Sequence, residues 1–194
     1  MARTREFNEI EALDKAVELF WEKGYTATSA NDLVKGLGLS RSSIYSTFTD
    51  KRTLYIRALD QYKKRYVDAT LQLVKQSNDL PKTIAQIFQM IVDQDITAKI
   101  PKGCFMVNTS VELGPHDQQI AKIVSDHEAN VEATFEVAIL KGQEKGQISK
   151  THSAKALARF LYNNIAGLRV AIKSKVGKAT LEDIIKVSMS VLKD

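Results

Sequence analysis

Apolar residues recur along most of the chain at the spacing of α-helices. In the first such segment Ile10, Leu13, Val17 and Phe20 follow one another at steps of three and four residues, which places them on one helix face. The sequence has no sustained alternation of period two and no Asn-Gly or Asp-Gly hairpin pair. The pattern therefore predicts an all-α protein of about nine helices.

Polar N-cap residues and Gly or Pro breakers divide this pattern into segments. A side-chain oxygen just before an apolar run accepts the free N–H groups of the first helical turn, and Gly or Pro ends a helix. The expected helices cover approximately residues 8–24, 28–36, 40–47, 50–78, 81–98, 103–113, 117–145, 153–175 and 180–193. The fourth of these is expected to be one long helix that begins at the cap Asp50.

The two short helices near the N-terminus are joined by Leu37-Gly38-Leu39, which predicts a helix-turn-helix motif over about residues 29–48. Gly38 suits the turn because glycine adopts positive φ without strain. We expect the apolar residues of the motif to pack against apolar residues of the first helix. The residues are Leu33, Leu37, Leu39 and Ile44 of the motif and Ile10, Val17 and Phe20 of the first helix. Residues 1–50 would then form an N-terminal three-helix domain, and residues 51–194 a helical C-terminal domain.

Small hydroxyl and basic side chains remain for the outer face of the third helix. Short hydroxyls allow a close approach to a DNA backbone, and an arginine at a helix start can reach a guanine edge. The candidate DNA contacts are Arg41, Ser42, Ser43, Tyr45, Ser46 and Thr47. Lys51 would combine a cation with the free N–H groups at a helix start, which favours a phosphate.

Charge and composition narrow the class of protein without naming a partner. Residues 35–66 carry eight Lys or Arg against two Asp, a net of +6, within a chain of net charge +5. That segment either forms a surface that binds a polyanion such as DNA or is a helix face exposed to solvent. With 44% hydrophobic residues, the single cysteine Cys104, a charged N-terminus and no long apolar run, we expect a cytoplasmic protein without a membrane partner.

The familiar signatures of enzymes and metal sites are missing from the sequence. No phosphate loop, CxxC or HExxH motif occurs, and no Ser-His-Asp set lies at a recognisable elbow. His116, Asp117, His127 and Glu128 hold possible metal-ligating groups, but the two histidines are too far apart in sequence to form a standard pair. We therefore expect no catalysis, no metal and no cofactor.

The stretch "GYTATSANDLVKGLGLSRSSIYSTFTDKRTLY" resembles the DNA-binding domain of the tetracycline-repressor (TetR) family. The matching positions are Gly24-Tyr25, Thr28, Gly38-Leu39-Ser40, Tyr45, Phe48, Lys51 and Leu54. The resemblance implies a homodimeric repressor of a palindromic double-stranded operator, released by a small-molecule inducer. By position it assigns phosphate contacts to Ser29, Ser43, Tyr45, Thr47 and Lys51, and base contacts to Arg41, Ser42, Tyr45 and Ser46. Ala30 departs from members with a long polar side chain, so we expect no base contact from the second helix.

A second stretch, "GCFMVNTSVELGPHD", is similar to a segment of one group of these regulators. The family architecture implies an inducer pocket in the C-terminal domain, for which we expect Tyr62, Phe88, Phe105, Asn108 and Asn130 as borders. Glu112 lies on the same kind of apolar helix and is expected to be exposed or locally satisfied. The wide apolar faces of residues 153–193 would form the dimer seam, with Leu168 and Ile185 within it.

Cys104 has two interpretations. It is expected in the first turn of a helix, where the helix dipole and Lys102 would favour a thiolate, so it is a candidate sensor of electrophiles or oxidants. Alternatively it is an inert apolar residue among Phe105, Met106 and Val107. Two rivals to the regulator remain: a helical ligand-binding protein with a vestigial helix-turn-helix, and a helical enzyme.

Overall fold

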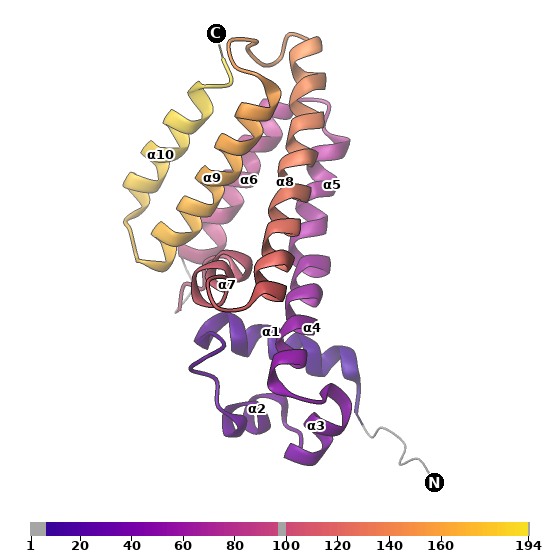
Figure 1. Cartoon of the computed structure of the whole chain (residues 1–194). Coiled ribbons are helices and arrows are strands. Elements are labelled where there is room, and N and C mark those ends of the chain that lie inside the picture. The colour runs from indigo at the N-terminus through magenta and orange to yellow at the C-terminus, as the bar shows by residue number, and fades with distance from the viewer. Residues whose placement is uncertain (1–6, 97–99, 194) are drawn as a thin grey trace.

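The computed structural model describes residues 7–96 and 100–193, and over these ranges the chain is helical with no strand (Figure 1). The elements are α1 (Glu9–Lys23), α2 (Ala30–Leu37), α3 (Arg41–Phe48), α4 (Lys51–Tyr62), η1 (Lys63–Val67), α5 (Asp68–Gln76), α6 (Leu80–Ile96), α7 (Phe105–Glu112), α8 (Gln118–Glu144), α9 (Ala154–Lys173) and α10 (Lys178–Ser190). Because α4, η1 and α5 follow without a break, the described residues form nine helices. The all-α prediction is confirmed.

The N-terminal helices begin at polar caps. The Asn8 carboxamide oxygen accepts the N–H groups of Ile10 and Glu11 at the start of α1. Ser29 and Asp32 form a reciprocal capping box on α2. The Ser40 side chain accepts the Ser43 N–H at the start of α3, and the Asp50 side chain accepts the Thr53 N–H at the start of α4. These local bonds fix where the short helices start.

The helix expected at 50–78 is continuous but contains a π-helical turn, η1, between α4 and α5. A π turn adds one residue to the helical repeat, so it rotates everything that follows relative to what precedes it. The apolar positions show why it is needed here. Leu54, Ala58 and Tyr62 are four apart, Val67 follows after five, and Leu71 after four again. The extra residue keeps Leu71 on the buried side.

Two apolar cores lie along this long helix. The lower core joins α1, α2, α3 and α4, and Phe105 and Met106 of α7 and Ile120 of α8 complete it. The upper core joins α5, α6, α8, α9 and α10 (Figure 1). α7 therefore belongs to the C-terminal half of the sequence but packs into the N-terminal core.

One member of the expected packing set is placed differently. Ile10 is 63% exposed, so the prediction that it packs under the helix-turn-helix is wrong. The buried face of α1 consists of Ala12, Leu13, Ala16, Val17 and Phe20. Ile10 lies in the first turn of α1, before the first of these buried residues, and contributes little to the core.

Candidate DNA-binding surface

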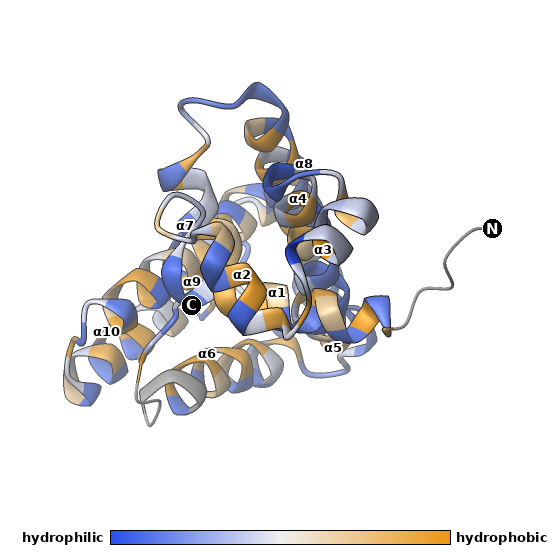
Figure 2. Ribbon diagram, turned by 90° about the horizontal axis from the view of Figure 1, so that it is seen from below, coloured by the Kyte–Doolittle hydropathy of each residue, from blue (hydrophilic) through white to orange (hydrophobic). Residues whose placement is uncertain are grey.

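The helix-turn-helix forms one end of the molecule (Figure 1). Gly38 has φ 70° and ψ 28°, the left-handed conformation that a tight turn requires, and its N–H donates to the Val34 carbonyl. Leu33, Leu37 and Ile44 are at most 2% exposed, so the apolar sides of both helices are committed to the core. Figure 2 views the molecule from below, onto the end that α2 and α3 form.

The polar side of α3 faces solvent. Arg41, Ser42 and Ser46 are exposed, whereas Ser43, Tyr45 and Thr47 are half-buried. The Arg41 guanidinium lies 5.8 Å from the centre of the Tyr45 ring, which is within cation–π range. All six candidate residues of α3 therefore lie on a short helix whose other side is locked in place.

The serines around the start of α3 bond to one another. The Ser40 hydroxyl lies 2.9 Å from the Ser42 hydroxyl and 2.8 Å from that of Ser43, and it also caps the helix. The Ser46 hydroxyl donates to the Ser43 carbonyl at 3.1 Å. These local bonds orient the hydroxyls, and each oxygen still has a lone pair with which to accept a further bond.

Lys51 begins α4 beside this surface. Its ammonium group lies 4.4 Å from the centre of the Tyr25 ring. Burial lowers the pKa of Lys51, and the nearby Glu112 and Asp32 carboxylates oppose that change. Ser29, the remaining predicted phosphate contact, is exposed, and its hydroxyl donates to Asp32 at 2.6 Å. Lys51 thus lies against the Tyr25 ring at the start of α4.

The junction between α3 and α4 is a strained turn. Thr49 has φ 66° and ψ −58°, and the Asp50 N–H donates to the Phe48 carbonyl at 2.7 Å. These are the features of the γ-turn with positive φ, which is rare and costly for a β-branched residue. The turn sets the direction of α4, and with it the position of Lys51, relative to α3.

Glu112, at the C-terminal end of α7, holds the loop between α1 and α2. Its carboxylate accepts the Tyr25 N–H at 3.0 Å and the Thr26 N–H at 2.7 Å. Burial alone would raise the pKa of Glu112, but these donations outweigh it and hold the pKa below its ordinary value. The apolar pattern around Glu112 gave no sign of this role, because the bonded atoms are backbone groups more than eighty residues away.

A second contact joins the two halves nearby. Arg52 donates to both carboxylate oxygens of Asp117, at 2.7 and 2.9 Å, and to Gln119 at 2.8 Å. Bonding to Arg52 lowers the pKa of Asp117 to about 2. Asp117 also caps α8, so this residue, once a possible metal ligand, has a structural partner. In the described residues no group of three His, Cys, Asp or Glu side chains is placed to hold a metal.

The basic segment 35–66 is partly neutralised in three dimensions, because three of its cations pair with carboxylates from outside the segment. Carboxylates that lie far away in the sequence pair with it: Glu9 with Arg57, Asp14 with Arg65 and Asp117 with Arg52. The net charge of a sequence window therefore overstates the positive field on this surface. Arg41 and Lys51 are the cations of the segment that lie beside the exposed face of α3.

The residues expected to border an inducer pocket do not form one group. Tyr62 and Phe105 are buried together, with ring centres 5.6 Å apart. Phe88 is buried in the upper core, Asn108 donates to the Lys102 carbonyl at 2.9 Å, and Asn130 is exposed. A cavity of about 330 Å³ lies elsewhere, between α5, α6 and α8.

Cys104 is the N-cap residue of α7, so it lies just before the helix rather than in its first turn. Its sulfur accepts a hydrogen bond from the Tyr62 hydroxyl at 3.6 Å, and the residue is half-buried. The Lys102 ammonium is paired with Glu18 and lies 5.4 Å from the centre of the Trp21 ring. The cation expected to activate the thiol is therefore engaged by α1.

Comparisons with known proteins agree on one family. Residues 12–58 match the family model "Bacterial regulatory proteins, tetR family", and residues 81–186 match "Tetracyclin repressor-like, C-terminal domain". The chain is 30% identical over 193 residues to the uncharacterized HTH-type transcriptional regulator YezE of Bacillus subtilis (strain 168), covering 99% of this chain and 100% of YezE. It is 31% identical over 192 residues to the HTH-type transcriptional repressor ComR of Escherichia coli (strain K12), covering 98% of this chain and 90% of ComR.

Solved structures show the same fold. A cysteine mutant of the TetR family transcriptional regulator CifR, complexed with 26bp double-strand operator DNA, superposes with a TM-score of 0.85 at 21% identity and covers 96% of this chain and 98% of its own. The reduced form of E. coli NemR gives a TM-score of 0.82 at 19% identity, covering 95% and 94%. No helix among the described residues is long and apolar enough to cross a membrane. The chain belongs to the TetR family of bacterial transcriptional regulators.

Proposed function

We propose that the protein is a sequence-specific DNA-binding repressor that places α3 in the major groove of its operator. The observation that carries this proposal is the two-sided character of α3. Ile44 and Phe48 are buried, while Arg41, Ser42 and Ser46 of the same helix are exposed. An arginine at the start of a groove-bound helix reads guanine, and the hydroxyls and Lys51 bind the phosphates on either side.

The operator is a palindrome, bound by a homodimer that forms through the outer faces of α9 and α10. These faces expose apolar side chains: Phe160 is 37%, Val170 48% and Val187 66% exposed. Leu168, expected in the seam, is 1% exposed and belongs to the core of the subunit. A two-fold interface pairs the same surface of both subunits, so the two copies of α3 would face two half-sites.

A small molecule in the C-terminal domain releases the DNA. The residues around Tyr62 and Cys104 join buried aromatic rings to a few polar groups, the composition of a ligand site. Cys104 caps the start of α7, and Glu112 at its other end holds the α1–α2 loop. A ligand that displaces α7 would therefore loosen the support of Lys51, provided that it binds the displaced state more tightly.

Thiol modification is a second candidate for the release signal. The Cys104 sulfur is half-buried and lies where α7 meets α4, because the Tyr62 hydroxyl of α4 donates a hydrogen bond to it. A bulky adduct on this half-buried sulfur would separate α7 from α4. Labelling of the native protein should modify Cys104 and weaken DNA binding, whereas a Cys104→Ser variant should keep binding DNA after treatment with a quinone. If Cys104 reacts only in denaturant, this route is excluded.

Fluorescence anisotropy with DNA from upstream of the protein's own gene tests DNA binding. We expect saturable binding that survives an excess of random DNA and disappears when one palindromic half is scrambled. Equal affinity for all DNA, or no binding, would favour the rival in which the helix-turn-helix is vestigial. The helical enzyme remains a rival only if the protein turns over a substrate, and no step of the proposed function requires that.

A further inference from the structure

We propose that the cavity between α5, α6 and α8 binds an anionic amphiphile, a small molecule with an apolar body and one carboxylate or phosphate group. The cavity measures about 330 Å³, near the lower end of the range for small-ligand sites. The ends of α5 and α8 and the start of α6, which line it, lie toward the end of the molecule away from the helix-turn-helix (Figure 1). The proposal concerns binding alone, so it does not depend on the proposed DNA-binding function.

The floor and walls of this cavity are mainly apolar. Val74 and Leu80 come from α5 and α6, and α8 supplies Ala133, Val137 and Ala138. Val137 is 54% exposed, so the structure leaves an apolar side chain facing solvent at this site. Covering apolar surface of this kind with a ligand excludes water from it and lowers the free energy.

One end of the cavity is closed by a fixed loop. The Gln147 side chain, which lines the cavity, donates to the Asn78 carbonyl at 2.8 Å and ties the loop after α8 to the turn before α6. Next to it, the Ser77 and Thr83 hydroxyls lie 2.7 Å apart. The end wall is therefore built before any ligand arrives, which limits the cost of ordering on binding.

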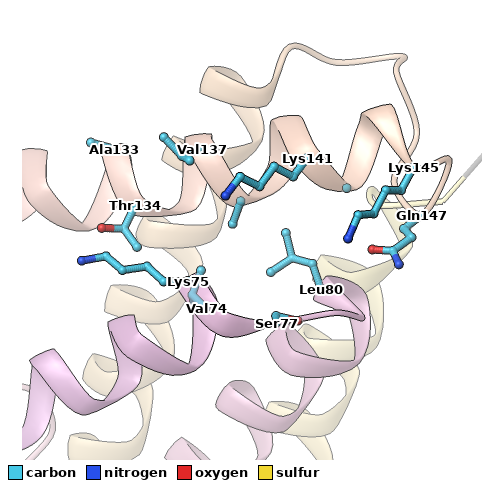
Figure 3. Close-up of a pocket in the computed structure, with 12 residues that line it drawn as sticks. Val74, Lys75, Ser77, Leu80, Ala133, Thr134, Val137, Lys141, Lys145 and Gln147 are labelled. Carbon is cyan, nitrogen blue, oxygen red and sulfur yellow. The ribbon is translucent and has the colours of Figure 1, made fainter.

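Three lysines surround the cavity, and no Asp or Glu lines it. Figure 3 shows Lys75 on the α5 side, with Lys141 and Lys145 on the α8 side. None of the three has a described ion pair, whereas the exposed Lys122 and Lys178 are each paired with an acid four residues later. Cations on both sides of an apolar cavity complement a single anionic head attached to an apolar body.

The chemistry of the walls selects against other ligands. A neutral apolar molecule would gain no attraction from the three exposed ammonium groups, and a cation would be repelled by all of them. A divalent metal would find no carboxylate in the lining.

Isothermal titration of the full-length protein with decanoate and with decyl phosphate tests the proposal. We expect one saturable site per chain for at least one of the two anions, and no saturable binding of decanol or decyltrimethylammonium at the same concentrations. Replacing both Lys141→Met and Lys145→Met should weaken binding about tenfold or more, because two charge-assisted contacts are lost while the apolar stems remain. The matched control replaces Lys122→Met and Lys155→Met, two exposed lysines outside the cavity, and should bind like the parent.

A blocking variant tests the location without removing charge. Ala133→Trp at the exposed rim of the cavity should abolish binding while the thermal unfolding midpoint stays within a few degrees of the parent. The proposal is overturned if neither anion binds, if the cation binds as well as the anions, or if both lysine pairs lower affinity equally. It is also overturned if the protein binds only vesicles of anionic lipid and no free decanoate or decyl phosphate.

Discussion

Arg41 and Lys51 carry different parts of the proposed DNA contact. Lys51 lies at the start of α4 on the Tyr25 ring, where it can neutralise one phosphate. Lys51→Ala should therefore weaken binding to operator and random DNA alike, and the slope of log affinity against log salt should fall by about 0.9. Anisotropy titrations at several salt concentrations measure this. Lys155→Ala, an exposed lysine at the start of α9, is the control, and an unchanged slope for Lys51→Ala would remove its phosphate role.

Arg41 is exposed at the start of α3, so its expected effect is on sequence preference. Arg41→Ala should cost about 1–3 kcal/mol on the best operator and little on random DNA, if the guanidinium binds a guanine edge. Competition titrations against operators changed at single base pairs measure the preference. An equal loss on specific and random DNA would show that Arg41 contacts only the backbone.

His127 on α8 gives the protein a pH-dependent stability. It is 5% exposed, and its Nδ1 atom has no hydrogen-bond partner among the described residues. Burial first, and then the nearby Lys63, lower the pKa of His127 from 6.5 to about 4, while Asp68 acts in the opposite sense. In the unfolded chain the group takes up its proton near pH 6.5, so protons favour unfolding as the pH falls from there toward 4.

The free energy of unfolding should therefore fall by on the order of 1–2 kcal/mol between pH 7 and pH 5 through this residue alone. In His127→Leu that part of the loss should be missing, because the unfolded chain no longer binds the proton. Urea titrations at the two pH values, at equal protein concentration, measure the difference. If both proteins lose the same free energy, His127 is not the buried neutral group described here.

At the next level up, helices were predictable where the signal is local. The caps Asn8, Ser40 and Asp50 each bond within their own first turn, so the sequence alone located these helix starts, and it placed the start of α2 to within one residue of its cap Ser29. The π turn at Lys63–Val67 was not predicted, although the five-residue apolar step from Tyr62 to Val67 marks it. The inducer-pocket residues were chosen by residue type and by the helix that carries them. Neither property determines which way a side chain faces, so the five residues did not come together.

α7 is one of the elements through which the C-terminal half contacts the DNA-binding end, and its Glu112 holds the α1–α2 loop. Glu112→Ala would remove two charge-assisted bonds to the Tyr25 and Thr26 backbone and release the loop that carries the Tyr25 ring under Lys51. Operator affinity should fall about tenfold, while the salt slope stays that of the parent because Glu112 touches no phosphate. Glu144→Ala, on exposed α8 surface, is the control.

Circular dichroism must show the same helix content for Glu112→Ala and the parent before these affinities are compared. If Glu112→Ala binds operator as tightly as the parent, the contact is a packing feature and does not position Lys51. A fall in the salt slope would instead point to a direct change in the phosphate contacts.

For the whole molecule, the overall fold was easier to predict than its surface. Periodicity and the motif match were sufficient for an all-α regulator with a helix-turn-helix. The basic window 35–66 was not a guide to the surface charge, because Glu9, Asp14 and Asp117 fold back onto it. Leu168 and Val170 illustrate the same limit for the dimer seam: both lie in one apolar run, yet one is buried in the subunit and the other is 48% exposed.

The exposed face of α10 allows a test of how the subunits assemble. Val187→Glu places a charge on the exposed face of α10, where it is harmless to an isolated subunit but would be buried without a partner in a two-fold interface, at a cost of several kcal/mol. Light scattering should show a soluble monomer, and circular dichroism should show the helix content of the parent. Binding to the palindromic operator should weaken far more than binding to a single half-site. Leu140→Glu, 47% exposed on α8, is the matched control and should remain a dimer. A Val187→Glu protein that stays dimeric and binds the full palindrome normally would show that the subunits meet through another face.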